Sequence, residues 1–192
     1  MNVLLLSPIN SEINSFFEKN DVTYTQTHKK ILIEPVVKLN PDFILSYRYR
    51  HIIDEKFLQM VKVPIVNLHH SFLPFNRGAH PNFWSFYEDT PKGISIHLID
   101  KGIDTGDIIY QEEIQLNLNS TFRETYKKLD DEIVDRFIKI YPDIVAKNYD
   151  LIKQKSKGTF HNASEIDKYL IKYPNLWDMK INSFLKKEKE SS

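Results

Sequence analysis

Val3-Leu4-Leu5-Leu6-Ser7-Pro8 is the stretch that decides the fold, because an unbroken apolar run ends abruptly at a Ser-Pro pair. A run without polar alternation is typical of a strand buried on both faces, as in a parallel sheet. The pattern returns at Phe43-Ile44-Leu45-Ser46-Tyr47, directly after the turn residues Asn40-Pro41-Asp42. Two such strands predict a sheet that is covered on both sides.

Helical and strand-like segments alternate around these two runs. Helical spacing of apolar residues predicts helices over Ser11–Lys19, Ile31–Leu39 and Asp54–Val61, and β-rich composition predicts strands at Val22–Gln26 and Pro64–Leu68. Strands that alternate with helices need crossover connections. The sequence therefore predicts an α/β fold with a mostly parallel central sheet flanked by helices.

The chain changes character after Leu68. A polar loop precedes a short aromatic helix near Phe83–Tyr87, and two further strands are predicted at Gly93–Ile99 and Asp107–Ile114. A long helix begins near Thr121, where Thr121 and Glu124 have the spacing of a capping box. Its apolar stripe, predicted to face the core, consists of Phe122, Tyr126, Leu129, Ile133, Phe137 and Ile140.

The last part of the chain is polar from Lys147 and ends in a charged run, Lys186–Ser192. We expect this end to be frayed. The predicted division is a catalytic domain over residues 1–150 and a short C-terminal extension over residues 151–192, which serves dimerisation or forms a substrate loop.

Composition narrows the class of protein. The 192 residues carry 26 basic and 26 acidic side chains, so no general attraction for nucleic acid or an anionic membrane is expected. The absence of cysteine excludes disulfides, thiolate-bound zinc and a cysteine nucleophile, and favours a reducing compartment. No basic n-region opens the chain, and no stretch approaches the roughly 20 apolar residues of a membrane span. A cytoplasmic protein is predicted.

The distribution of glycine disfavours two nucleotide-binding classes. Only five glycines occur, and none precedes Gly78. The first strand therefore cannot lead into a GxGxxG or GxxxxGK[ST] loop, whose glycines allow the backbone to approach phosphate closely.

Polar groups that can carry chemistry cluster in the middle of the chain. Five of the seven histidines lie there, namely His51, His69, His70, His80 and His97, together with Asn67, Asp100, Asp104 and Asp107. A zinc site is the alternative to a catalytic site. Adjacent residues on extended chain point to opposite sides, and no HExxH spacing occurs, so we expect no metal.

Four blocks of this region together resemble the folate-dependent formyltransferase family. They are Val66-Asn67-Leu68-His69-His70-Ser71-Phe72-Leu73-Pro74, Arg77-Gly78 with Pro81, Gly93-Ile94-Ser95-Ile96-His97, and Gly102-Ile103-Asp104-Thr105-Gly106-Asp107-Ile108. The resemblance is dense over residues 41 to 115. It implies a Rossmann-like formyltransferase fold with a small C-terminal extension, and N10-formyltetrahydrofolate as co-substrate without a metal.

The resemblance assigns catalytic roles to Asn67, His69 and Asp104. In formyl transfer an amine attacks the formyl carbon, so charge develops on the carbonyl oxygen and the nitrogen must lose a proton. Asn67 is expected to donate a hydrogen bond to this oxyanion, and His69 to stabilise the tetrahedral intermediate. Asp104 is expected to orient His69, raise its pKa and relay the amine proton through water.

Two segments are expected to bind the folate by resemblance, mainly through backbone groups and apolar side chains that cover the pteridine. The first contains Tyr49, Arg50, His51 and Ile52. The second runs from Ile99 to Asp104 and includes Gly102 and Ile103.

The acceptor is predicted from the block Asn76–Trp84, which resembles the short nucleotide-sugar N-formyltransferases, as do Gly158–His161 and Leu176–Asp178. The expected substrate is a nucleotide-linked amino sugar such as a dTDP-4-amino-4,6-dideoxyhexose, used for instance in lipopolysaccharide O-antigen biosynthesis. Its contacts are assigned to Arg77, Gly78, His80 and Trp84, although a core position for Trp84 is equally compatible.

Other members of the family fit less well. Glycinamide ribonucleotide enzymes have a glycine-containing loop after the first strand, where this chain has Ser7-Pro8-Ile9-Asn10. Methionyl-tRNA formyltransferases carry a further C-terminal domain and a basic surface. A formyltetrahydrofolate hydrolase would use the same three residues with water as acceptor. A homodimer is expected because family members often dimerise.

Overall fold

The computed structural model describes residues 1–191, which form two compact units. Unit 1 comprises Met1–His69, Ile96–Tyr110 and Val134–Gln154, and unit 2 comprises His70–Ser95, Gln111–Ile133 and the described residues from Lys155 onwards. The elements are β1 (Asn2–Leu6), α1 (Ser11–Lys19), β2 (Thr23–Thr27), α2 (Ile33–Leu39), β3 (Phe43–Tyr47), α3 (Glu55–Met60), β4 (Ile65–His69), β5 (Arg77–Gly78), α4 (Pro81–Tyr87), β6 (Gly93–Leu98), β7 (Ile108–Glu113), α5 (Phe122–Ala146), β8 (Phe160–His161), η1 (Ala163–Ile166), α6 (Asp167–Lys172), η2 (Leu176–Asp178) and α7 (Ile181–Ser191).

The central sheet has six strands in the order β2-β1-β3-β4-β6-β7. β1 pairs in parallel with β2 and with β3, and β3 pairs in parallel with β4. The prediction of an α/β fold with a mostly parallel sheet is therefore confirmed, and each strand predicted from the sequence is present within one or two residues of its expected bounds.

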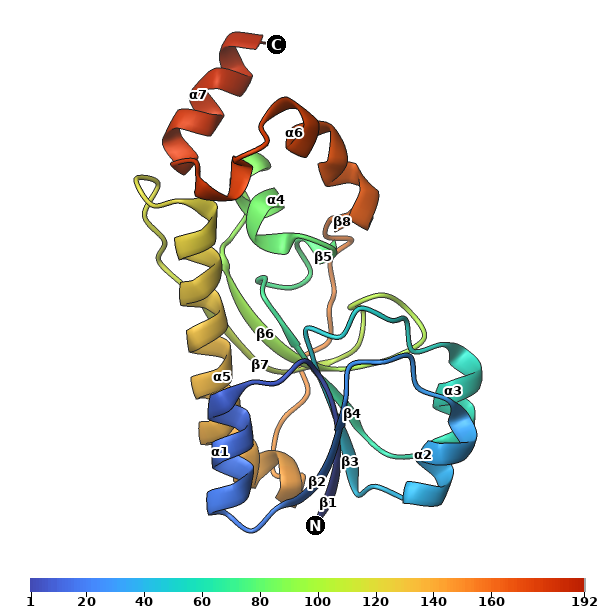
Figure 1. Cartoon of the computed structure of the whole chain (residues 1–192). Helices are drawn as coiled ribbons and strands as arrows, with labels where there is room; N and C mark the ends of the chain where they lie inside the picture. Colours follow the sequence, from blue (N-terminus) through green and yellow to red (C-terminus); the bar gives the residue numbers. More distant parts are fainter. Residues whose placement is uncertain (192) are drawn as a thin grey trace. The chain divides into compact units, whose positions relative to one another are not determined.

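Helices cover both faces of the strands in unit 1. Figure 1 shows α1 on one side of β1 and β3, and α2 and α3 on the other. The pleat of β1 explains the arrangement, because successive side chains point to opposite faces. Leu4 and Leu6 join a buried cluster with Val36 of α2 and Phe57 of α3. The unbroken apolar run is thus a strand with no solvent-facing side.

The opposite face of the same strands is closed by aromatic rings. Phe17 of α1 lies 5.6 Å from the ring of Tyr141 on α5, and Phe43 of β3 lies 6.2 Å from it. Burial, together with the charge of Asp42, raises the pKa of the Tyr141 phenol to about 12. This hydroxyl therefore stays neutral at physiological pH.

Helix α5 begins as the sequence predicted. The Thr121 N–H donates to Oε2 of Glu124 at 2.8 Å, and the Glu124 N–H donates to Oγ1 of Thr121 at 3.1 Å, which completes the capping box. Within the predicted stripe, Phe122, Leu129, Ile133 and Phe137 are buried. Tyr126 and Ile140 are only half-buried, so the stripe is narrower than expected at those two positions.

The predicted fraying of Lys186–Ser192 remains a prediction, and Ser192 lies outside the described residues. Helix α7 continues to Ser191, and Ile181 and Phe184 on this helix are fully buried. They pack with Phe83 of α4 and Tyr169 of α6 in the hydrophobic cluster of unit 2. Apolar residues spaced by three hold the helix to this cluster, and their effect outweighs the charged residues that surround them. The predicted boundary at residue 150 remains a prediction.

None of the helices described over residues 1–191 combines the length and the apolar character that a membrane crossing requires.

Candidate functional site

Three predicted catalytic residues meet at one end of β4. Asn67 and His69 are alternate residues near the end of this strand, so both side chains project from the same face. Asp104 comes from the loop between β6 and β7. Its Oδ1 accepts a hydrogen bond from Nδ2 of Asn67 at 3.3 Å, and its Oδ2 lies 3.6 Å from Nδ1 of His69. The proximity of these three groups, predicted by resemblance, is present in the fold.

Burial strengthens the electrostatics of this group. The side chain of His69 is 8% exposed and that of Asp104 is 14% exposed. Water screens a charge pair poorly at such a position, so the carboxylate favours the protonated form of a nearby imidazole. An amide donor, an imidazole and a carboxylate are therefore held together in a largely dehydrated place.

A fourth residue, His97 on β6, completes the cluster. Its Nδ1 lies 2.8 Å from the carbonyl oxygen of Leu98, so this nitrogen must carry a proton and donate. In the neutral ring Nε2 is then an acceptor, and Nδ2 of Asn67 lies 3.1 Å from it. The side chain of His97 is 1% exposed, and its ring meets that of His69 edge to face at 6.1 Å.

The sequence placed His97 in the histidine cluster but assigned it no role. The sequence contained a signal, because His97 lies near the end of the predicted strand Gly93–Ile99, directly before the loop that carries Asp104. Only the register of the folded sheet brings its ring against Asn67.

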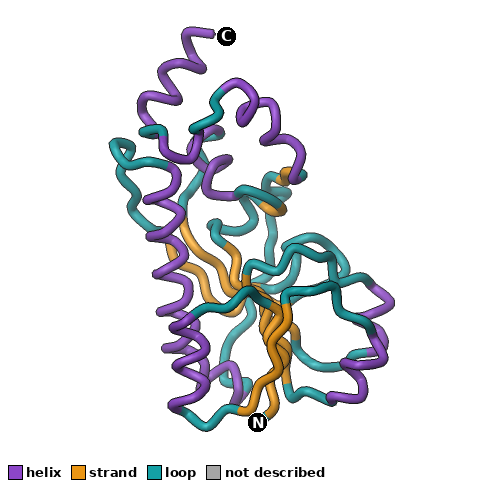
Figure 2. The backbone as a smooth tube through the Cα atoms, viewed as in Figure 1, coloured by secondary structure: helices purple, strands orange, loops and turns teal. Residues whose placement is uncertain are grey.

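The loop that carries Asp104 is irregular between the end of β6 and the start of β7 (Figure 2). Asp100 organises its first turn, since Oδ1 accepts from the Gly102 N–H at 3.0 Å and from Oγ1 of Thr105 at 2.5 Å. Gly106 has no room for a side chain, because a Cβ there would lie 1.8 Å from the carbonyl oxygen of Leu98. Asp104 itself has a φ of +53°, in the left-handed region that few residues other than glycine adopt.

The first predicted folate segment follows β3. Tyr49 fastens it, because its hydroxyl accepts from the Ile31 N–H at 3.0 Å and donates to the carbonyl oxygen of Lys29 at 3.0 Å. Burial raises the pKa of this phenol, and the Ile31 hydrogen bond opposes the shift. Arg50 and His51 are exposed, and Ile52 is 74% exposed.

The second predicted folate segment, like the first, packs against the hydrophobic cluster that contains Val36 and Phe57. Ile99 and Tyr49 both pack against the cluster formed by α2, α3 and the strands. Gly102 is half-buried, and Ile103 is 42% exposed. The two segments therefore share a packed base, and each presents a large apolar side chain to solvent.

The predicted substrate residues all belong to unit 2. Arg77 donates from Nη1 to the carbonyl oxygen of Lys157 at 3.1 Å. Gly78 has a φ of +85°, and a Cβ there would lie 2.3 Å from the carbonyl oxygen of His161. The two residues hold β5 against β8, so both have a structural task in addition to any contact with substrate.

The remaining two substrate candidates are aromatic. His80 precedes α4 and stacks on Trp177 with ring centroids 5.6 Å apart. Trp84 is 4% exposed and stacks on His161 at 3.9 Å and 9°. Trp84 thus occupies the core of the unit, which is the alternative that the sequence left open, and its contact with a substrate stays a prediction.

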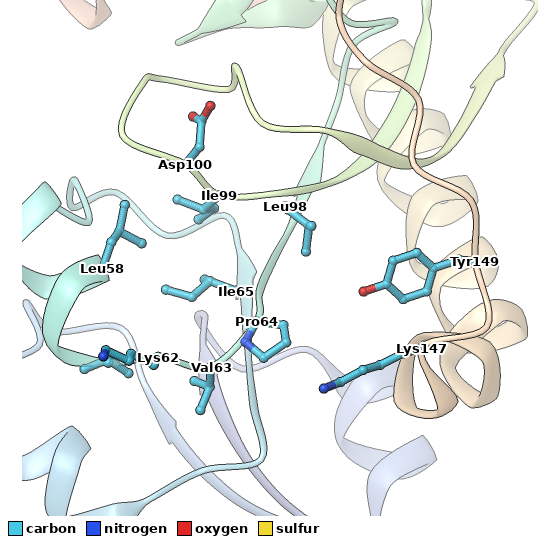
Figure 3. Close-up of a pocket in the computed structure, with 11 residues that line it drawn as sticks. Leu58, Lys62, Val63, Pro64, Ile65, Leu98, Ile99, Asp100, Lys147 and Tyr149 are labelled. Carbon is cyan, nitrogen blue, oxygen red and sulfur yellow. The ribbon is translucent and has the colours of Figure 1, made fainter.

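A pocket of about 500 Å³ lies elsewhere in unit 1. Figure 3 shows Pro64 and Ile65, at the start of β4, between Leu58 on one side and Tyr149 on the other. The lining does not include Asn67, His69 or Asp104, so this pocket is separate from the three predicted catalytic residues. Over residues 1–191, no three His, Asp or Glu side chains are grouped as metal ligands.

The geometry limits what the cluster can do. The chain contains no cysteine that could act as a nucleophile. The groups present can polarise a carbonyl, stabilise a negative oxygen and accept a proton. This set suits group transfer to an amine or to water without a covalent enzyme intermediate.

Comparison with known proteins agrees with this chemistry. Residues 4–141 match the family model described as formyl transferase. The methionyl-tRNA formyltransferase of Clostridium tetani is 33% identical over 141 residues, which cover 73% of this chain and 45% of that protein. The chain therefore spans about half the length of the curated relatives that it matches.

Solved structures extend the likeness to the whole chain. The formyltransferase PseJ from Anoxybacillus kamchatkensis, in complex with UDP-4,6-dideoxy-4-formamido-L-AltNAc and tetrahydrofolate, is 39% identical with a TM-score of 0.85. The alignment covers 95% of this chain and 96% of that one. A sugar N-formyltransferase from a Shewanella species, at 22% identity and a TM-score of 0.76 over 88% and 79% of the two chains, shares the fold. On the family match over most of its length, the chain belongs to the formyl transferase family.

Proposed function

We propose that this chain transfers the formyl group of N10-formyltetrahydrofolate to the primary amine of a nucleotide-linked amino sugar. The observation that carries the proposal is the 39% identity with PseJ over nearly the whole of both chains. PseJ is in complex with a UDP-linked 4-formamido sugar and tetrahydrofolate. A UDP-linked 4-amino-4,6-dideoxy sugar is therefore the acceptor to test first, followed by dTDP-linked amino sugars.

The cluster around Asp104 supports the transfer step. When the amine attacks the formyl carbon, the carbonyl oxygen becomes negative and needs hydrogen-bond donors. The Asn67 amide donates to both His97 and Asp104, and the bond to Asp104 is the longer one at 3.3 Å. Asn67 turns this hydrogen from Asp104 to the oxyanion, while the bond to His97 holds the amide in place.

The proton of the attacking amine must also leave. When the Asn67 amide no longer donates to Oδ1 of Asp104, this oxygen can accept the proton of the amine, directly or through water. His69 in its protonated form stabilises the negative oxygen from the other side, and its ring is kept near Asp104 at 3.6 Å. As the bond between the formyl carbon and N10 breaks, the proton taken from the amine is returned to N10, so neutral tetrahydrofolate leaves and the formamide is formed.

The residues of unit 1 fit a folate. A flat pteridine needs apolar cover on its faces and backbone groups at its edges. Ile52 and Ile103 are large apolar side chains exposed on the two predicted segments, whose bases pack on one hydrophobic cluster. Tyr49, Arg50, His51, Ile99 and Gly102 complete the proposed folate set.

The proposal assigns the nucleotide sugar to unit 2. Arg77, Gly78 and His80 are its contacts, and Trp84 supports them from the core. Placement in the cytoplasm is supported by the lack of cysteine, which fits a reducing compartment. A homodimer and a pathway such as O-antigen biosynthesis are further parts of the proposal.

A mass-spectrometric transfer assay tests the reaction. The protein is incubated with 10-formyltetrahydrofolate and UDP-, dTDP- or GDP-linked amino sugars, with glycinamide ribonucleotide as a separate acceptor. We expect the mass of one formyl group to be added to a nucleotide sugar. Transfer to glycinamide ribonucleotide alone, or release of formate with no acceptor modified, would contradict the proposal.

The variant His69→Ala tests the assignment of the site. We expect turnover to fall by roughly 10²-fold or more, because the imidazole stabilises charge in the transition state. His28→Ala is the matched control, since His28 is an exposed histidine of the same unit. Equal turnover in the two variants would remove His69 from the mechanism.

A further inference from the structure

The three residues Ile152, Lys153 and Gln154, here called the strap, follow α5 and contact the loop that carries Asp104. The backbone of Ile152 pairs with that of Ile108 through two hydrogen bonds, each 2.9 Å long. Nζ of Lys153 donates to Oδ2 of Asp107 at 2.6 Å. About fifty positions in the sequence separate the strap from this loop, so only the fold brings them together.

Within the strap, Gln154 is the residue that contacts Asp104 itself. Its Nε2 donates to the carbonyl oxygen of Asp104 at 2.9 Å and to that of Gly106 at 2.7 Å. A primary amide has two hydrogens on its nitrogen, and each is directed here to a carbonyl. The side chain therefore bridges the carbonyl groups of the two residues on either side of Thr105.

The backbone of Asp104 needs such support. A φ of +53° lies in the left-handed region, which aspartate enters more readily than most residues with a Cβ but which still favours glycine, so contacts to this turn help to hold it. Asp100 holds the turn from inside through Gly102 and Thr105. Gln154 holds it from outside at the carbonyl of Asp104 itself, so it fixes the direction in which the Asp104 side chain leaves the backbone.

We propose that Gln154 is a positioning residue for formyl transfer, which holds the Asp104 carboxylate against Asn67 and His69. This inference rests on the proposed function, because it takes Asp104 to be the group that receives the amine proton. Both hydrogen bonds of the Gln154 amide go to backbone carbonyls, those of Asp104 and Gly106, so we assign its effect to the backbone of Asp104.

Two variants of Gln154 and one control test the proposal. Gln154→Ala removes both hydrogen bonds, and we expect kcat to fall by roughly 10-fold to 10²-fold, as small misplacements of catalytic groups do. KM for the nucleotide sugar should stay within about twofold, because misplacement of Asp104 affects the reaction step rather than binding. Lys153→Ala removes an adjacent ion pair whose lysine is 73% exposed, and it should retain the wild-type kcat.

Gln154→Glu adds a pH-dependent readout. The glutamate has the size of glutamine, but its ionised form has no hydrogen to donate to the two carbonyls. Protonation restores one donor, so its kcat relative to that of Gln154→Ala should rise as the pH is lowered. If Gln154 had only a structural role, Gln154→Ala and Gln154→Glu would both have a lower thermal midpoint, and the ratio of their kcat values would not change with pH.

An NMR titration of His69 separates this inference from the proposed function. Loss of the carboxylate from its position near Nδ1 should move the titration of the His69 ring to lower pH in Gln154→Ala, with or without an active acceptor. An inactive wild type with this shift present would contradict the proposed function and support the positioning role. A Gln154→Ala protein with the kcat of Lys153→Ala, or with an unchanged His69 titration, would overturn the inference.

Discussion

The variant His97→Asn tests the contact between His97 and Asn67. An asparagine side chain reaches about as far as Nδ1 of histidine, so its amide can still donate to the carbonyl oxygen of Leu98, 2.8 Å from Nδ1 in the wild type. No atom then stands at the position of Nε2, which lies 3.1 Å from Nδ2 of Asn67. The Asn67 amide loses the shorter of its two hydrogen bonds and keeps the one to Asp104.

The size of the effect follows from this lost bond. Leaving one donor unsatisfied in a buried place costs about 1–3 kcal/mol. If Asn67 must hold its orientation in the transition state, the same free energy corresponds to a decrease in kcat of roughly 5- to 150-fold. The free energy of unfolding should fall by a similar amount, about 1–3 kcal/mol.

His97→Gln is the matched variant. Its longer side chain places a carboxamide oxygen near the position of Nε2, so the acceptor for Asn67 is restored while the donor to Leu98 is lost. We expect this variant to keep kcat within about tenfold of the wild type. Steady-state formyl transfer gives kcat, and urea unfolding gives the stability of the same samples. A wild-type kcat in His97→Asn, or equal losses in the two variants, would refute the role of His97 in orienting Asn67.

Three further predictions concern other parts of the chain. Tyr49→Phe removes the hydroxyl that bonds Ile31 and Lys29, so KM for formyltetrahydrofolate should rise about two- to tenfold in steady-state kinetics, and an unchanged KM would detach this residue from folate binding. Phe184→Ala empties a fully buried position, and urea unfolding should show a loss of about 3–5 kcal/mol, whereas a frayed α7 would show almost none. Hydrogen bonds from the Asn162 N–H and from His161 lower the pKa of Glu165 below its ordinary value of 4.5. The ionised carboxylate therefore stabilises the fold above pH 4.5, and this stabilisation is lost as the pH falls through the lowered pKa. The thermal midpoint of Glu165→Gln should therefore lie below that of the wild type at pH 7 and approach it in acid, and a constant difference across this range would contradict the assignment.

Much of the candidate site could be predicted because its geometry depends on local order. Asn67 and His69 share a face since residues two apart on a strand always do, and the strand itself is marked by its apolar run. The Thr121 and Glu124 capping box is likewise a matter of spacing over three residues. Their partner Asp104 lies 37 positions beyond Asn67, too far for any rule of local spacing, and only the family resemblance predicted it.

The sequence by itself determined the alternation of strands and helices and the buried character of β1 and β3, and through its family resemblance it predicted the catalytic groups. Tertiary structure decided three other features: the packing of α7 through Phe184, the contact of His97 with Asn67, and the bridge from Gln154 to Asp104. The physical reason is the same in each case. A charged helix is held by a few apolar residues once a hydrophobic cluster exists for them, and a polar side chain finds its partner only when sheet register and loop packing bring distant segments within hydrogen-bond distance.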